Sequence, residues 1–214
     1  MRTYDVLDAS CDALLPVVGT LDDETGWGST RCHAWTARDL VHHLLGDAQR
    51  ALVALHSPAS GEPDVDAVTY WRNWQPEALG ADAGRRYTRI MSSAWSRVGP
   101  LAELYVETAR AVLVAARERS EAALVATQGH VITVGDLLST LAVEATVHHL
   151  DLGAGAPSRP GLREVRRVLD GLLGRPGPVA DDARYILIAT GREAPSDEER
   201  ALLGGDNKRL PLFG

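Results

Sequence analysis

Four long segments of the sequence carry apolar residues at helical spacing, and this periodicity most constrains the fold. The segments cover approximately residues 4–21, 36–55, 82–117 and 133–152. Apolar side chains that recur every three or four residues form one stripe along a helix, and such stripes must bury one another. Gly99-Pro100 should kink or divide the third segment, because proline lacks the amide hydrogen that a helix interior requires. The pattern predicts a mainly α protein built on a four-helix bundle.

The C-terminal part of the chain has a different pattern. A glycine- and proline-rich stretch, GAGAPSRPG, follows the fourth segment and is typical of a linker. Beyond it the sequence predicts a helix (LREVRRVLDGLL), a strand (RYILIA) and a short helix with an acidic start (SDEERALL). We therefore expect two domains, the bundle over residues 1–155 and a small C-terminal α/β extension over residues 156–214.

The charge balance bears on partners and on location. The chain has a formal net charge of -7, which gives no basic surface for phosphates, so we expect no nucleic-acid partner. No apolar run reaches the roughly 20 residues that span a bilayer, and the acidic start is unlike a secretory signal. Cys11 and Cys32 form no pairing motif, and Cys32 is either a packing residue or a reactive thiol. We expect a cytoplasmic monomer or homodimer that binds small molecules.

The fourth segment places polar residues on a stripe that should face the core. Glu144 and His148 are four residues apart, so their side chains can converge on one point of a helix. Asp151 lies three residues further on and is placed to orient the His148 ring, whereas His149 points about 100° away. A buried carboxylate without a partner is costly, so another element of the bundle should satisfy Glu144.

The second segment, DLVHHLLGD, contains a second pair of histidines. His42 shares a helix face with Arg38 and Gln49 and should be solvated, whereas His43 lies at the edge of the apolar stripe beside Asp47. His43 is thus the better inward candidate. Two imidazoles and one carboxylate suit a divalent metal with an open position; zinc fits best, and nickel, iron and manganese are alternatives. The other interpretation is an ordinary hydrogen-bonded Glu144–His148 pair beside an unrelated core histidine.

Three motifs resemble a known family. WTARDLVHHLLGD resembles the pattern W-T-x-R-D-L-x-x-H-L-x-x-D of the mycothiol-dependent maleylpyruvate isomerase family, and EATVHHLDL is similar to its Glu-x-x-x-His-x-x-Asp-Leu signature. TGRE with LLGGDNKRLPL resembles its C-terminal tail. The resemblance implies a DinB-like four-helix bundle, mycothiol as thiol cosubstrate, and metal ligands at His43, Glu144 and His148. It aligns no single residue with thiol or acid binding; the candidates are Arg85, Arg86, Arg89, Tyr70, Trp71, Arg72 and Trp74.

These features favour a metal-dependent thiol transferase or isomerase that acts on a small electrophile. A free thiol is mostly protonated at neutral pH, and coordination to a divalent cation deprotonates it. Two alternatives use the same residues: a metal-dependent hydrolase that activates water, and a non-catalytic binding or regulatory bundle. The sequence has neither a phosphate-binding glycine loop nor a Gly-x-Ser-x-Gly motif, which argues against phosphoryl transfer and serine hydrolysis.

Overall fold

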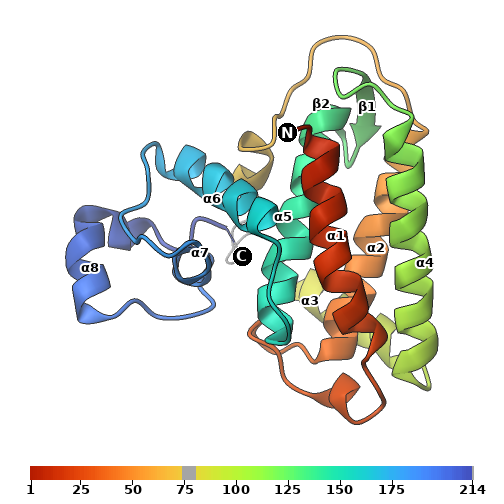
Figure 1. Ribbon diagram of the computed structural model, residues 1–214, viewed down its shortest axis with the longest axis horizontal. Coiled ribbons are helices and arrows are strands. Elements are labelled where there is room, and N and C mark those ends of the chain that lie inside the picture. The colour runs from red at the N-terminus through yellow and green to blue at the C-terminus, as the bar shows by residue number, and fades with distance from the viewer. Residues whose placement is uncertain (74–80, 214) are drawn as a thin grey trace.

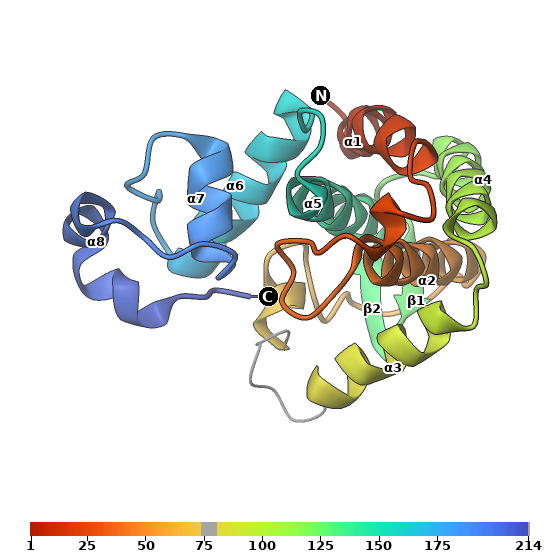
Figure 2. The ribbon, with the colours of Figure 1, turned by 90° about the horizontal axis from the view of Figure 1, so that it is seen from below.

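Four long helices form a bundle in the computed structural model, which describes residues 1–73 and 81–213. The bundle helices are α1 (Thr3–Gly19), α2 (Ala37–Leu55), α4 (Val98–Arg117) and α5 (Val134–Leu152). The helix α1 packs against α4 and α5, and α2 packs against the same two helices from the other side (Figure 1). Figure 2 shows this arrangement nearly end on. The predicted mainly α bundle is confirmed.

The two helices that carry the histidine pairs begin where the sequence predicted. Thr36 caps α2 in a capping box with Asp39, whose carboxylate accepts a hydrogen bond from the Thr36 amide at 2.9 Å. Thr133 caps α5 by accepting the Asp136 amide at 3.0 Å. The helix α5 ends at Gly153, whose φ of 67° is a left-handed conformation that glycine adopts without strain. Local capping therefore fixes both helices.

The third predicted segment is two helices, α3 (Ala81–Ser93) and α4, and the break precedes Gly99-Pro100. That dipeptide lies in the first turn of α4, where proline is tolerated because the missing amide hydrogen has no helical partner. Arg38 helps to hold the break, since its Nη2 donates to the Ser92 carbonyl at 3.0 Å. The expectation that Arg38 is solvated is wrong: it is 4% exposed and stacks on Trp27.

A small β-hairpin precedes α5 and was not predicted. Strand β1 (Leu124–Thr127) pairs antiparallel with β2 (His130–Thr133), and Leu124 lies opposite Thr133. Gln128 and Gly129 form the two-residue turn, and both have positive φ, as the twist of a tight hairpin requires. The hairpin lies at one end of the bundle, next to α2 (Figure 1).

The described residues of the C-terminal segment contain helices and loops and no strand. It contains α6 (Arg159–Leu173), α7 (Asp182–Ala189), α8 (Asp197–Leu203) and the 3-10 helix η3 (Gly204–Arg209). The 3-10 helices η1 (Thr25–Trp27) and η2 (Thr69–Asn73) lie earlier in the chain. The predicted strand RYILIA is wrong, because these residues belong to α7. A short apolar run that is buried on every side shows no period, so it does not distinguish a strand from a helix.

The helix α5 is shared by two hydrophobic cores. Its residues Leu138 and Ala142 belong to the bundle core, whereas Val143 and Val147 pack with α6 and α7 in a second core. The helix α6 also packs against α1. Among the described helices, none is both long and apolar enough to cross a membrane. A domain boundary at residue 155 stays a prediction.

Candidate metal centre

The three side chains that the sequence singled out meet inside the bundle. Glu144 Oε2 lies 3.0 Å from His148 Nε2 on the same helix and 3.4 Å from His43 Nε2 on α2. One ligand atom from each of the three residues lies within 4.8 Å of the other two. The residues have the donor types and the mutual distances that a divalent cation requires.

The far side of the His148 ring is fixed by a buried relay. His148 Nδ1 lies 2.9 Å from Asp151 Oδ2, the contact that the sequence spacing predicted. Asp151 is also held by Arg192, whose Nε lies 3.2 Å from Oδ1. Arg192 is itself anchored through Nη1 to the Thr190 carbonyl at 3.0 Å. With Nδ1 occupied, His148 presents Nε2 to Glu144 and His43.

Arg192 was not identified from the sequence. It belongs to the TGRE motif, which follows α7 and was recognised only as part of a family tail. The residue is 41 positions from Asp151 along the chain, so no helical spacing connects the two. The structure shows that the C-terminal segment contributes a buried cation to the surroundings of the site.

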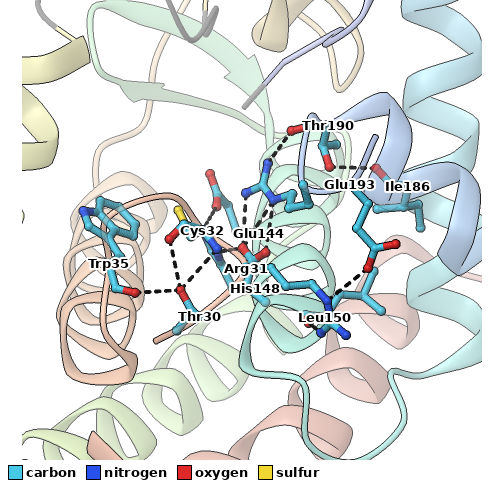
Figure 3. A network of polar contacts seen from close by, with 12 residues as sticks. Thr30, Arg31, Cys32, Trp35, Glu144, His148, Leu150, Ile186, Thr190 and Glu193 are labelled. Atoms are coloured by element: carbon cyan, nitrogen blue, oxygen red, sulfur yellow. Dashed lines mark hydrogen bonds and ion pairs between the residues drawn. The ribbon is translucent and has the colours of Figure 1, made fainter. Parts of the chain in front are cut away.

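The loop between η1 and α2 covers the histidines. The Trp35 ring lies 5.1 Å from the His43 ring and 6.3 Å from the His148 ring, measured between centroids. Thr30 donates to the Trp35 carbonyl at 3.0 Å and so fixes the loop. Figure 3 shows Thr30, Cys32 and Trp35 on one side of His148 and the C-terminal residues on the other. Trp35 therefore shields one side of the site from water.

The pKa values within the site are strongly shifted. Burial alone would raise the pKa of the Glu144 carboxyl, but hydrogen bonds with His148 and His43 outweigh it and hold this pKa well below its ordinary value. Burial alone would lower the pKa of His148, but its contacts with Asp151 and Glu144 raise it to about 9. The metal-free cluster is thus a buried carboxylate facing an imidazolium.

A further carboxylate borders the cluster. Asp47 lies one turn after His43 on α2, and its Oδ2 is 3.1 Å from His43 Nε2. This oxygen is buried without a hydrogen-bond partner, while Oδ1 pairs with Arg50. Burial raises the Asp47 pKa. Two imidazoles, one carboxylate and an unsatisfied carboxylate oxygen are a donor set that fits a divalent cation.

The second histidine of each pair lies outside the cluster of ligand atoms. His42 is half-buried, and burial lowers its pKa. His149 is 2% exposed, and its Nε2 lies 2.9 Å from the Ala154 carbonyl oxygen. The structure brings His43 and His148 together with Glu144, and their role as metal ligands stays a prediction. His149 is a buried core residue.

A small pocket of about 20 Å³ lies beside Glu144 and Asp47. Its polar lining includes Arg50, the Tyr70 hydroxyl and Gln128, whose Nε2 donates to Tyr70 at 2.7 Å. This volume accommodates about one water molecule, so a larger ligand requires the lining to move. The half-exposed Arg50 side chain is the part of the lining best able to do so.

The other predicted ligand-binding candidates have different positions. Trp71 is 3% exposed and stacks on Phe213, so it is part of the second core. Burial raises the pKa of the Cys32 thiol to about 12, and the nearby charge of Arg85 opposes this rise only weakly. The remaining arginines, Arg72, Arg86 and Arg89, are exposed. Trp74 lies outside the described residues.

The family model described as Mycothiol maleylpyruvate isomerase N-terminal domain matches residues 7–153, more than half of the sequence. The chain belongs to this family. Its family and its structural neighbours point to an enzyme of the isomerase or transferase type. Among curated proteins, none matches the chain.

Two solved structures have the same fold. The crystal structure of the mycothiol-dependent maleylpyruvate isomerase aligns with a TM-score of 0.57 and 17% identity over 78% of this chain and 68% of its own. A histidine-to-alanine mutant of such an isomerase aligns with a TM-score of 0.63 and 16% identity over 90% of this chain and 89% of its own. The likeness to the second structure extends beyond the family-matched residues into the C-terminal segment.

Proposed function

We propose that the protein is a metal-dependent, mycothiol-using isomerase or S-transferase that acts on a small electrophilic organic acid. The observation that carries the proposal is the convergence of His43, Glu144 and His148 within a chain of the mycothiol maleylpyruvate isomerase family. The structural neighbours are named as mycothiol-dependent maleylpyruvate isomerases. Their substrate and cosubstrate are the first candidates for this protein.

The protein residues have separable roles in this proposal. His43, Glu144 and His148 would hold the divalent cation, which would supply a Lewis acid that lowers the pKa of a bound thiol, so that the thiolate forms at neutral pH. Asp151 keeps the proton of His148 on Nδ1, so the lone pair of Nε2 stays available to bind the metal. Trp35 excludes water from one side.

The pocket beside Glu144 is the side on which substrate would enter. Tyr70 and Gln128 offer hydroxyl and amide groups there, and Arg50 offers a positive charge for an acid group. The apolar lining residues Leu137 and Leu141 lie next to these polar groups. A small unsaturated acid has a charged carboxylate for the polar groups and an apolar carbon chain for the leucines, which supports this choice of substrate class.

Metal content and thiol dependence together test the proposal. The purified protein should contain about one divalent ion per chain, and zinc is the first expectation from the ligand types. It should convert maleylpyruvate only when mycothiol is present, and chelator treatment should stop the reaction until metal is restored. His42→Ala is a matched control that leaves the three ligands in place.

The alternatives give different results in the same assay. A hydrolase would retain the metal and consume its substrate without any thiol. A non-catalytic bundle would bind metal or thiol without turnover. Metal-free protein with undiminished mycothiol-dependent turnover would refute the role given to His43, Glu144 and His148.

A further inference from the structure

Two carboxylates flank the histidine cluster at similar helical spacing but face different ring atoms. Asp151 follows His148 by three residues and contacts Nδ1, the nitrogen that points away from the cluster. Asp47 follows His43 by four residues and contacts Nε2, the nitrogen that points into it. Asp151 is therefore placed to orient a ring, whereas Asp47 meets the ring nitrogen that enters the cluster, at the edge of the group formed by His43, Glu144 and His148.

The two oxygens of Asp47 have different surroundings. Oδ1 pairs with Arg50 on the next turn of α2, whereas Oδ2 is buried without a hydrogen-bond partner. A buried carboxylate oxygen that accepts nothing costs free energy, and native proteins rarely leave one in that state. Both oxygens of Asp151, by contrast, have donors from His148 and Arg192. Of these two carboxylates, only Asp47 has a buried oxygen without a hydrogen-bond partner, and this oxygen needs an explanation.

His43 Nε2 connects Asp47 to the proposed ligands. It lies 3.1 Å from Asp47 Oδ2 and 3.4 Å from Glu144 Oε2, so the two carboxylate oxygens approach the same nitrogen. Separations near 3 Å are those between neighbouring ligands of one ion, because ligand atoms lie about 2.0–2.2 Å from zinc. The Asp47 side chain is 12% exposed and also lines the pocket beside Glu144.

We propose that Asp47 is a fourth protein ligand of the metal, an inference that rests on the metal site of the proposed function. The ion then has two imidazole nitrogens and two carboxylate oxygens. Four protein ligands fill a tetrahedral site, so a thiol can bind only as a fifth ligand or by displacing one of them. The second carboxylate oxygen also makes the site more favourable to harder ions such as manganese and iron(II) than the three-residue site with one carboxylate would be.

Cobalt(II) is the probe for this inference, because its visible absorption reports coordination number and geometry. We would titrate the metal-free full-length protein with cobalt(II) and compare wild type with Asp47→Ala, Asp151→Asn and Arg50→Gln. Asp47→Ala should change the position and intensity of the bands and weaken binding by more than the roughly 10–100-fold typical of outer partners. Asp151→Asn should weaken binding with unchanged bands, and Arg50→Gln should leave the bands unchanged.

Each result has one meaning. Wild-type bands in folded, cobalt-loaded Asp47→Ala would overturn the fourth ligand and leave the three-residue site intact. Failure of the wild type to bind cobalt(II) would overturn the metal site and this inference with it. If Asp47→Ala does not fold, as judged by circular dichroism, a crystal structure of the cobalt-loaded wild type decides. Asp47 Oδ2 should then lie about 2.0–2.2 Å from the ion, and a separation beyond 3 Å would refute the inference.

Discussion

Asp151 at the end of α5 and Arg192 after α7 form a buried ion pair at 3.2 Å, with the Asp151 side chain fully inaccessible to solvent. The pair joins the C-terminal segment to His148, because Asp151 holds the Nδ1 of that ring. A change at Arg192 therefore reaches a proposed metal ligand through one intermediate residue.

We predict that Arg192→Gln weakens metal binding by roughly 10–100-fold, the range for outer partners of a metal ligand. Without the guanidinium, Asp151 loses its anchor and positions the His148 ring less firmly. The carboxylate charge is also no longer neutralised, so the His148 pKa rises and the ion must displace a more tightly held proton. Calorimetric titration with zinc measures the change. Arg200→Gln removes an exposed arginine of the same segment and should leave the affinity unchanged. Equal affinities of the two variants would contradict the relay.

We predict that His43→Ala and His148→Ala lose the metal, whereas His42→Ala retains it. The first two remove donors whose atoms lie within the 4.8 Å cluster, and His42 contributes no atom to it. All three should keep the helical circular dichroism of the wild type, because removing one member of a buried polar cluster also relieves the cost of burying it. Metal stoichiometry after gel filtration decides, and an empty His42→Ala protein would show that the wrong histidine was selected.

His149→Ala should destabilise the protein without emptying the site. The His149 side chain is buried, and it bonds the Ala154 carbonyl in the chain that leaves α5. Truncation removes packing and a hydrogen bond, so we expect a loss of about 2–4 kcal/mol in the free energy of unfolding. Urea denaturation measures this loss, and metal analysis checks the site. Stability equal to that of His42→Ala would argue against a packing role.

Metal affinity should rise with pH. The contacts of His148 with Asp151 and Glu144 raise its pKa to about 9 in the metal-free protein, so below pH 9 the ion must displace a proton. Affinity should increase about tenfold per pH unit between roughly pH 6.5 and 9 and then level off. Calorimetry in buffers of different ionisation enthalpy counts the released proton. No proton release at pH 7.5 would contradict the assignment.

The stability of the metal-free protein should fall at both ends of the pH range. His148 has a higher pKa in the folded protein than its ordinary 6.5, so its contribution is complete below pH 6.5 and is lost as the pH rises through 9. The Glu144 pKa is lowered, so its contribution is present above pH 4.5 and is lost on acidification. Asp151→Asn should reduce the alkaline loss, because one of the contacts that raises the His148 pKa is gone.

Neither cysteine should act as a nucleophile. Burial raises the pKa values of Cys11 and Cys32 to about 12, so almost no thiolate exists at neutral pH. We predict slow alkylation of the native protein, fast alkylation after unfolding, and turnover by Cys32→Ser within about twofold of the wild type. Rapid alkylation of Cys32 in the folded protein would restore the reactive-thiol interpretation.

The parts of the site that could be predicted are those that one helix places by itself. Glu144, His148 and Asp151 follow from spacing on α5, and the convergence of His43 follows from the apolar stripe on α2. Asp47 carried the same kind of signal, four residues after His43, but periodicity does not report which ring nitrogen a carboxylate meets. Arg192 carried no local signal, because its partner lies on another element.

The fold shows the same limit. The starts of α2 and α5 lie where the sequence predicted them, because the caps at Thr36 and Thr133 are contacts between residues three apart. The break before α4 and the helical state of residues 184–189 depend instead on distant neighbours, such as Arg38 and the second core. Monomeric or dimeric assembly stays a prediction.

The separation of the cluster along the chain sets an order of events during synthesis. His43 precedes its partner Glu144 by 101 residues, which corresponds to roughly 5–20 s of translation at the usual 5–20 residues per second. Through that interval the chain on the ribosome carries His43 without Glu144 and His148, the other two proposed ligands. Loading of the proposed metal would therefore wait until α5 has emerged, and the contact of Arg192 with Asp151 forms later still.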